Sequence, residues 1–407
     1  MNSEKKVLSA LRIGDFRNFW VSQVISLSGT WMQHVAIGWL VYEMTSSPLY
    51  LGLTMMVLSA PIMVFTLIGG IFADRHPKRN ILIGTQVMSI VPAITLAVLT
   101  DLQIIELWHI FLIVFMIGTL NAFDIPARQS FFVEMVGKSN LLNAIALNSA
   151  AFNGARVLGP LFAGLIISRI NIETCFYING LSFAPAILVM MNIKTRGTGK
   201  VVGRRSIISE LGEGISFICG NIPIRTVFIT IALISLFGIP YSSFLPVIAE
   251  DILNTGAEGL GRLGGASGAG ALIAALIIAL KGTIRRRAAY MSIAIMGGSL
   301  SIFALTFSDI EIISLLVLVI TGFGIVSYLA NANNFIQQSV PDSIRGRVMS
   351  AYILVFLGMS PVGNLLVGYL AEFIGTMNAL RVSSVVCIAA SFYFIKNSEM
   401  VESRNVH

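Results

Sequence analysis

Charged residues are scarce in this sequence. Asp, Glu, Lys and Arg make up 12% of the 407 residues, whereas 56% are hydrophobic and the mean hydropathy is +0.84. Soluble domains carry about 25% charged residues, so this composition excludes an ordinary water-soluble fold. Most of the chain must therefore face lipid or other parts of the protein.

Cysteine and catalytic motifs are also lacking. The three cysteines, Cys175, Cys219 and Cys387, are isolated, which predicts neither a disulfide framework nor a metal site. The sequence contains no HExxH motif of zinc proteases, no GxSxG motif of serine hydrolases and no GxxxxGK[ST] motif of ATP-binding loops. These three classes of function are therefore not indicated. The glycine-rich stretch 259–271 leads into an apolar helix, which favours close helix packing over a nucleotide loop. We expect neither an enzyme nor a cofactor.

Long apolar stretches are what the sequence does contain. About twelve are long enough to cross a hydrocarbon core of about 30 Å as helices, which predicts an all-α polytopic membrane protein in contact with the lipid bilayer. They lie near residues 18–44, 50–72, 80–100, 107–127, 141–168, 172–192, 224–249, 262–281, 288–307, 311–334, 346–371 and 376–395.

Basic residues gather in alternate connections between these stretches. With a cytoplasmic N-terminus, 23 of the 27 Lys and Arg residues lie in cytoplasmic segments, leaving Arg169, Arg262 and Arg381 outside and Arg156 within the membrane. This positive-inside bias predicts that both termini are cytoplasmic. The net charge of +7 is scattered over separate loops, which argues against a nucleic-acid partner.

One long polar segment, 194–223, divides the chain. We expect six-helix bundles at 1–193 and 224–407, joined by a cytoplasmic linker whose part SIISELGEGISFI forms an interfacial helix. NAFDIPARQS at 121–130 is echoed by NANNFIQQSV at 331–340, so the two bundles are predicted to be pseudo-symmetric. Many transporters are built from related halves, with the substrate site near the midplane between them.

Several motifs resemble a known family. GGIFADRHPKR at 69–79 is similar to the loop between the second and third helices of the major facilitator superfamily, although Pro77 stands where glycine is usual. The stretch 16–53, NAFDIPARQSFFVEMV, LLNAIALNSAAFNGARVLGP and RGRVMSAYI resemble its transmembrane secretion effector branch, which includes the enterobactin exporter. The resemblance spans nearly the whole chain. It implies the major facilitator fold and secondary active export across a bacterial inner membrane.

The 69–79 loop is expected to help switch the transporter between states. Gly70 would permit close helix approach, and Asp74 would accept N–H bonds from a facing helix N-terminus near Arg345. The alternative is a positive-inside loop with one incidental acid. The residues expected to act in gating on this side are Gly70, Asp74, Arg75, Arg79, Arg345 and Arg347.

Arg156 lies near the middle of the fifth span, in FNGARVLGPLFAG. A charge there costs at least about 2.5 kcal/mol on insertion scales, so the side chain must face protein or water. It either contacts an anionic substrate or gates a path, or it makes a structural hydrogen bond to a neighbouring helix end. Gly159 and Pro160 resemble the fifth-helix Gly-Pro motif of antiporters in the superfamily, and Pro160 is expected to bend the helix.

Acidic residues are absent from the middle of every predicted span, so Asp124, near the cytoplasmic end of the fourth, is the best acid. Arg128 follows four residues later on the same helix face, and the pair is either a strut or part of proton coupling. His34, near the middle of the first span, titrates near neutral pH when unperturbed and is either a packing or a coupling residue.

By analogy with the superfamily, the first, fourth, seventh and tenth helices line the substrate cavity. Their polar and aromatic members either bond helices together or meet an amphipathic ligand. They are Gln33, His34, Asn121, Tyr241, Tyr328, Asn331 and Asn334. We expect an exporter of a small amphipathic or anionic molecule, a siderophore-like metabolite or a drug, driven by proton antiport. A lysophospholipid or lipid flippase is the alternative, and a non-transporting receptor the third.

Overall fold

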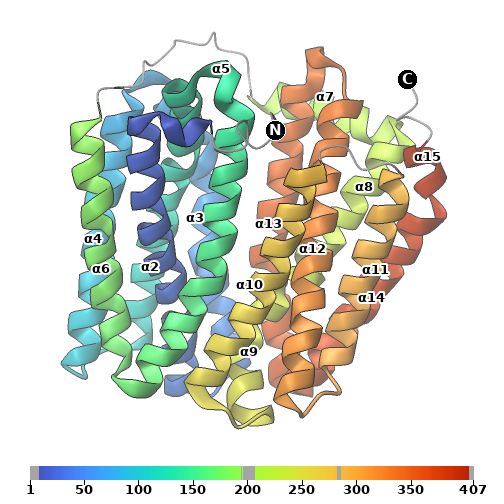
Figure 1. Cartoon of the computed structure of the whole chain (residues 1–407). Coiled ribbons are helices and arrows are strands. Elements are labelled where there is room, and N and C mark those ends of the chain that lie inside the picture. Colours follow the sequence, from blue (N-terminus) through green and yellow to red (C-terminus); the bar gives the residue numbers. More distant parts are fainter. Residues whose placement is uncertain (1–8, 194, 196–206, 282–285, 403–407) are drawn as a thin grey trace, which may run out of the picture. The chain divides into compact units, whose positions relative to one another are not determined.

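The computed structural model describes residues 9–193, 195, 207–281 and 286–402, and these are helical with short connections (Figure 1). No strand occurs among them. The prediction of an all-α polytopic membrane protein is confirmed. The helices before the linker are η1 (Ala10–Arg12), α2 (Gly14–Thr45), α3 (Pro48–Arg75), α4 (Lys78–Asp101), α5 (Leu107–Arg169) and α6 (Ile172–Asn192).

The later helices begin with α7 (Ile207–Gly220), which lies where the linker was expected to be helical. After it come α8 (Ile222–Leu233), η2 (Ile234–Gly238), η3 (Ile239–Phe244), α9 (Leu245–Val247), η4 (Ile248–Ile252), α10 (Gly256–Lys281), α11 (Arg287–Leu305), α12 (Glu311–Ser339), α13 (Asp342–Ile374), α14 (Thr376–Lys396) and α15 (Ser398–Glu402).

Eleven stretches within the described residues are long and apolar enough to cross a membrane. The 63-residue α5 supplies two of them, Leu107–Gly137 and Asn143–Arg169, because the backbone leaves the helical conformation at Gly137, where φ is 67°. The first predicted span falls in α2, which is 32 residues long but carries several Ser and Gln residues and lies outside that set of eleven.

The span predicted at 224–249 departs from a regular α-helix. It runs from α8 through the π-helix η2, the 3-10 helix η3 and the short α9 into a second π-helix, η4. Pro240 and Pro246 lie within it and donate no backbone N–H, so the regular hydrogen-bond ladder cannot run through them. The predicted span itself is confirmed, since Ile222–Ile252 is long and apolar enough to cross a membrane. The departure lies in its hydrogen bonding, and such π-helical turns are frequent at functional sites.

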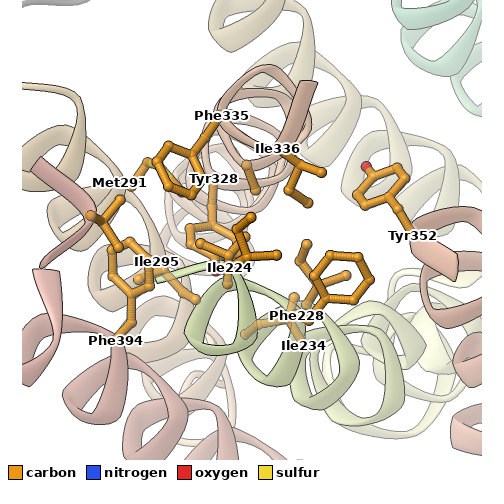
Figure 2. Packing of buried hydrophobic residues seen from close by; sticks show 14 of the residues in the cluster. Ile224, Phe228, Ile234, Met291, Ile295, Tyr328, Phe335, Ile336, Tyr352 and Phe394 are labelled. Atoms are coloured by element: carbon orange, nitrogen blue, oxygen red, sulfur yellow. The ribbon is translucent and has the colours of Figure 1, made fainter. Parts of the chain in front are cut away.

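Two units emerge from the contacts within the chain. The first comprises Met1–Met44, Val57–Val202 and Gly256–Gly265, and the second comprises Thr45–Met56, Gly203–Thr255 and Ala266–His407. In the first, the rings of Phe19 and Phe132 meet edge to face at 5.5 Å, between α2 and α5. In the second, the rings of Tyr328 of α12 and Phe394 of α14 have centroids 5.4 Å apart, within a hydrophobic core of aliphatic and aromatic side chains (Figure 2).

Helices α3 and α5 approach closely at a glycine of the 69–79 loop motif. The glycine at this contact is Gly69, and the close helix approach expected at Gly70 stays a prediction. A Cβ atom on Gly69 would lie 2.2 Å from the carbonyl oxygen of Ala122, whereas one on Gly70 would meet nothing within 4 Å. Helix periodicity puts adjacent residues on different faces, and the motif alone does not show which face meets α5.

This pair gives a matched test of helix packing. We expect Gly69→Ala to destabilise the protein by about 1–3 kcal/mol, because the new methyl group must push α3 away from the backbone of α5. Gly70→Ala is expected to be neutral or slightly stabilising, since alanine favours helix more than glycine does. Chemical denaturation of the two variants in detergent measures the difference, and equal stabilities would contradict the packing described.

Candidate functional site

Arg156 is half-buried in the second span of α5, and its guanidinium lies over an aromatic ring. Its Cζ atom is 5.7 Å from the ring centroid of Trp31 in α2, within the range of a cation–π contact. The charge is thus stabilised by an aromatic face. A cation–π contact uses the ring and leaves the N–H donors of the guanidinium for a ligand.

Trp31 is the centre of an aromatic cluster around this charge. Its ring meets that of His34 edge to face at 5.9 Å and that of Phe152 at 5.6 Å. Nε2 of His34 is buried and has no hydrogen-bond partner among the described residues. We refer to Trp31, His34, Phe152 and Arg156 as the Arg156 cluster, which combines a cation, apolar rings and an unpaired imidazole nitrogen.

Gly159 brings α2 and α5 together beside the cluster. A Cβ atom at this position would lie 2.4 Å from Cβ of Trp31 and 2.9 Å from the backbone nitrogen of Met32, so only glycine fits. Pro160 is buried next to it, and α5 continues past it to Arg169. Gly159 therefore sets the separation of the two helices that carry the cluster, whereas Pro160 lies against Gly261 and Gly264 of α10.

Gln33 points to a different helix. Its Oε1 accepts a hydrogen bond of 2.7 Å from Nδ2 of Asn179 in α6, and both side chains are buried. Gln33 therefore bonds one helix to another. This is one of the two roles that the sequence left open for it, the other being contact with a ligand. Asn121 of α5 is half-buried.

Asp124 and Arg128 form a buried ion pair in the first span of α5, as their spacing predicted. Nε of Arg128 donates to Oδ2 of Asp124 at 2.8 Å, and the side chains are 16% and 7% exposed for Arg128 and Asp124. Oδ1 accepts from the Thr85 hydroxyl at 2.9 Å and from Nε2 of Gln86 at 3.4 Å. The Ser26 hydroxyl in turn donates to Oε1 of Gln86, so one network connects α2, α4 and α5.

The predicted cavity residues of the later spans lie in the second unit. Tyr241 is buried, and its hydroxyl is 2.6 Å from that of Ser267. Asn331 is buried and donates to the carbonyl of Ser327, one turn earlier in α12. Tyr328 is fully buried in the core of Figure 2, whereas Asn334 is exposed.

The residues predicted to act in gating fall into two classes. Asp74 and Arg75 are exposed at the end of α3. The other arginines have partners. Arg79 donates from Nε to the carbonyl of Met190 in α6 at 2.6 Å, and Arg347 pairs with Glu213 of α7. Arg345 pairs at 2.5 Å with Asp342, three residues earlier in its own helix α13. The contact expected between Asp74 and the helix near Arg345 stays a prediction.

Sequence reasoning missed the aromatic partners of Arg156. Trp31 and His34 are three residues apart in α2, which puts them on one helix face, and Phe152 and Arg156 are four apart in α5. That spacing was a usable signal. It was overlooked because aromatic residues within an apolar span are usually taken to face lipid or the protein core.

Comparison with known proteins identifies the family. The transmembrane secretion effector family model matches residues 5–405. The chain belongs to this family of the major facilitator superfamily. This transporter is 27% identical over 384 residues to the staphyloferrin A transporter of Staphylococcus aureus, covering 93% of this chain and 95% of that protein. It is 22% identical to macrolide efflux protein A of Streptococcus pyogenes, covering 92% and 94%.

Solved structures agree on the fold of this transporter. A bacterial homologue of the human lysosomal transporter Spinster superposes with a TM-score of 0.74 at 12% identity, covering 96% of this chain and 98% of that one. A POT family transporter, solved in complex with a thioalcohol-conjugated peptide, superposes with a TM-score of 0.76 at 14% identity, with 96% of each chain covered. At such low identities the likeness shows the fold alone.

Proposed function

We propose that this transporter is a secondary active exporter of a small amphipathic anion and that the Arg156 cluster reads the charge of its substrate. A siderophore-like metabolite or an acidic drug has the required chemistry. The names of two relatives, a staphyloferrin A transporter and a macrolide efflux protein, support transport of a small molecule, and the second supports export.

The observation that carries the proposal is the setting of Arg156. It is the basic residue that the sequence places within a membrane span, and its guanidinium is half-buried against Trp31. Placing a charged side chain within the membrane costs free energy, so such residues are rare and mark substrate or ion sites. Aromatic rings beside a cation suit a ligand with a flat apolar body and an acidic group.

Proton antiport is the proposed driving reaction. Two titratable groups are candidates to carry the proton: His34 inside the Arg156 cluster, with its unpaired Nε2, and Asp124, held by Arg128 and Thr85. His34 is the nearer to the substrate charge. A proton on its imidazole would add a second positive charge and favour anion binding, whereas antiport requires proton binding and substrate binding to exclude each other. Asp124 is therefore the proposed proton carrier.

The same proposal includes the topology. The halves 1–193 and 224–407 would rock against each other in alternating access, joined through 194–223, with both termini in the cytoplasm of a bacterial cell. The family's fold and the positive-inside distribution of Lys and Arg support this arrangement.

Vesicle transport tests the proposed function. Inside-out vesicles containing the wild-type protein are given a catecholate anion, a cationic dye or a lysolipid, each with an imposed proton gradient and with the gradient collapsed by an ionophore. We expect gradient-dependent accumulation of the anion and little of the dye. Accumulation of the cationic dye in place of the anion would overturn the proposal. Accumulation of the lysolipid in place of the anion would also overturn it and would favour a lipid flippase.

A further inference from the structure

An apolar groove of about 440 Å³ lies in the first unit, at the end of α3 and the beginning of α4. Its walls include Phe72 of α3, Gly84 and Met88 of α4, and Leu120 and Phe123 of α5. This volume falls within the range of small-molecule sites. We call it the α3–α4 groove, and none of the residues of the Arg156 cluster lines it.

The groove opens along surfaces that are apolar and exposed. Phe72 is 41% and Met88 is 51% exposed, and α3 has the smallest buried share, 17%, of the eleven candidate spans. Exposed apolar side chains along a membrane-spanning helix are stable against hydrocarbon and not against water. An alkyl chain is the occupant that these walls favour.

The mouth of the groove is polar, and a basic residue adjoins it in the chain. His76, Pro77 and Asn80 line it, and Arg75 is exposed next to them. The His76 ring stacks on Phe72 with centroids 4.0 Å apart, and its Nδ1 lies 3.0 Å from the carbonyl oxygen of Phe72, which holds the ring in place and leaves the other ring nitrogen for a ligand.

The charges around the mouth favour an anion. Asp74 is the one acidic residue of the segment 74–80, against three basic ones. Lys78 is engaged by Glu134 at 2.6 Å and Arg79 by the carbonyl of Met190, so Arg75 is the basic side chain left at the mouth. Basic pockets beside transmembrane helices attract anionic lipid headgroups.

We propose that the α3–α4 groove binds an anionic phospholipid of the surrounding bilayer, with one acyl chain along Gly84 and Met88 and the phosphate against Arg75, His76 and Asn80. The chain then lies against Thr85, which lines the groove and donates to Asp124. A lipid site here is independent of the exported substrate. It connects the bound lipid, through Thr85, with the buried Asp124–Arg128 pair.

Filling the groove tests the acyl-chain half of the proposal. A Cβ atom on Gly84 would meet nothing within 4 Å, and Gly84 lines the groove, so we expect the isobutyl group of Gly84→Leu to occupy groove volume. Gly297→Leu is the matched control, since Gly297 also lies in a helix, α11, and has the same free space. Both changes replace a helical glycine with a better helix former, so we expect both variants to fold.

Native mass spectrometry of the full chain in detergent, titrated with phosphatidylglycerol, measures the fraction that retains lipid. We expect Gly84→Leu to weaken phosphatidylglycerol binding at least about tenfold and Gly297→Leu to leave it unchanged. Equal binding by the two variants would overturn the proposal.

Charge changes at Asn80 test the headgroup half and do not depend on Gly84→Leu. Asn80 is exposed in the first turn of α4, where glutamate is well tolerated at a helix N-terminus. Asn80→Glu is expected to weaken phosphatidylglycerol binding several-fold and Asn80→Lys to strengthen it, with phosphatidylcholine of the same acyl chains unaffected by either. Phosphatidylglycerol binding that ignores both substitutions, or phosphatidylcholine binding as tight as that of phosphatidylglycerol, would show that the site does not recognise an anionic headgroup.

Discussion

Replacing Arg156 with glutamine is expected to lower kcat/KM for an exported anion about 10- to 100-fold, because a hydrogen bond to a charged partner is worth about 1.5–3 kcal/mol. The loss should fall mainly on anionic substrates, since the aromatic rings of the Arg156 cluster remain. The measurement is the initial rate of anion uptake into inside-out vesicles over a range of concentrations, corrected for the amount of folded protein.

Two further variants separate a site role from a structural one. Arg169→Gln removes the same charge from the same helix at its exposed end, and we expect it to transport normally. Arg156→Lys keeps the charge but loses the planar donor fork, so an intermediate rate is expected. Should Arg156→Gln transport anions as fast as Arg169→Gln does, Arg156 is a structural residue and the charge-reading role is wrong.

Asp124→Asn is expected to cost about 3–5 kcal/mol of folding stability, the largest stability effect that we predict. The change leaves the largely buried guanidinium of Arg128 without its counter-charge, and it weakens the acceptor for Thr85 and Gln86. Chemical denaturation in detergent, followed by intrinsic tryptophan fluorescence, measures the loss.

The double variant Asp124→Asn/Arg128→Gln is the control for this effect. Removing both charges leaves no uncompensated ion, so we expect it to regain a good part of the lost stability. A double variant less stable than Asp124→Asn would show that Arg128 stabilises the fold through contacts other than the pair. Transport by the double variant, measured with and without a proton gradient, then reports whether the pair also takes part in coupling.

The sequence predicted the fold well because membrane burial leaves a strong signal. A run of about 20 apolar residues has essentially one stable conformation in lipid, the helix, so element type and number follow from composition. The departures in the span Ile222–Ile252 arise from hydrogen-bond details around Pro240 and Pro246 that hydropathy does not record.

Side-chain partners were harder to predict. The Asp124–Arg128 pair followed from spacing along one helix, whereas Thr85 and Gln86 reach Asp124 from α4 and leave no pattern in the sequence. The choice between Gly69 and Gly70 also depended on the rotation of α3 about its axis. Contacts within one helix are set by periodicity, and contacts between helices are set by rotation and register, which an all-apolar surface does not encode.

The central claim is that Arg156 reads the negative charge of the substrate. Equilibrium binding of dihydroxybenzoate and of its uncharged methyl ester to the purified protein tests it without any assumption about coupling or vesicle orientation. We predict that the wild-type protein binds the anion at least about tenfold more tightly than the ester and that Arg156→Gln binds the two with equal affinity. A wild-type protein that does not distinguish them, or a variant that keeps the full preference, would contradict the account.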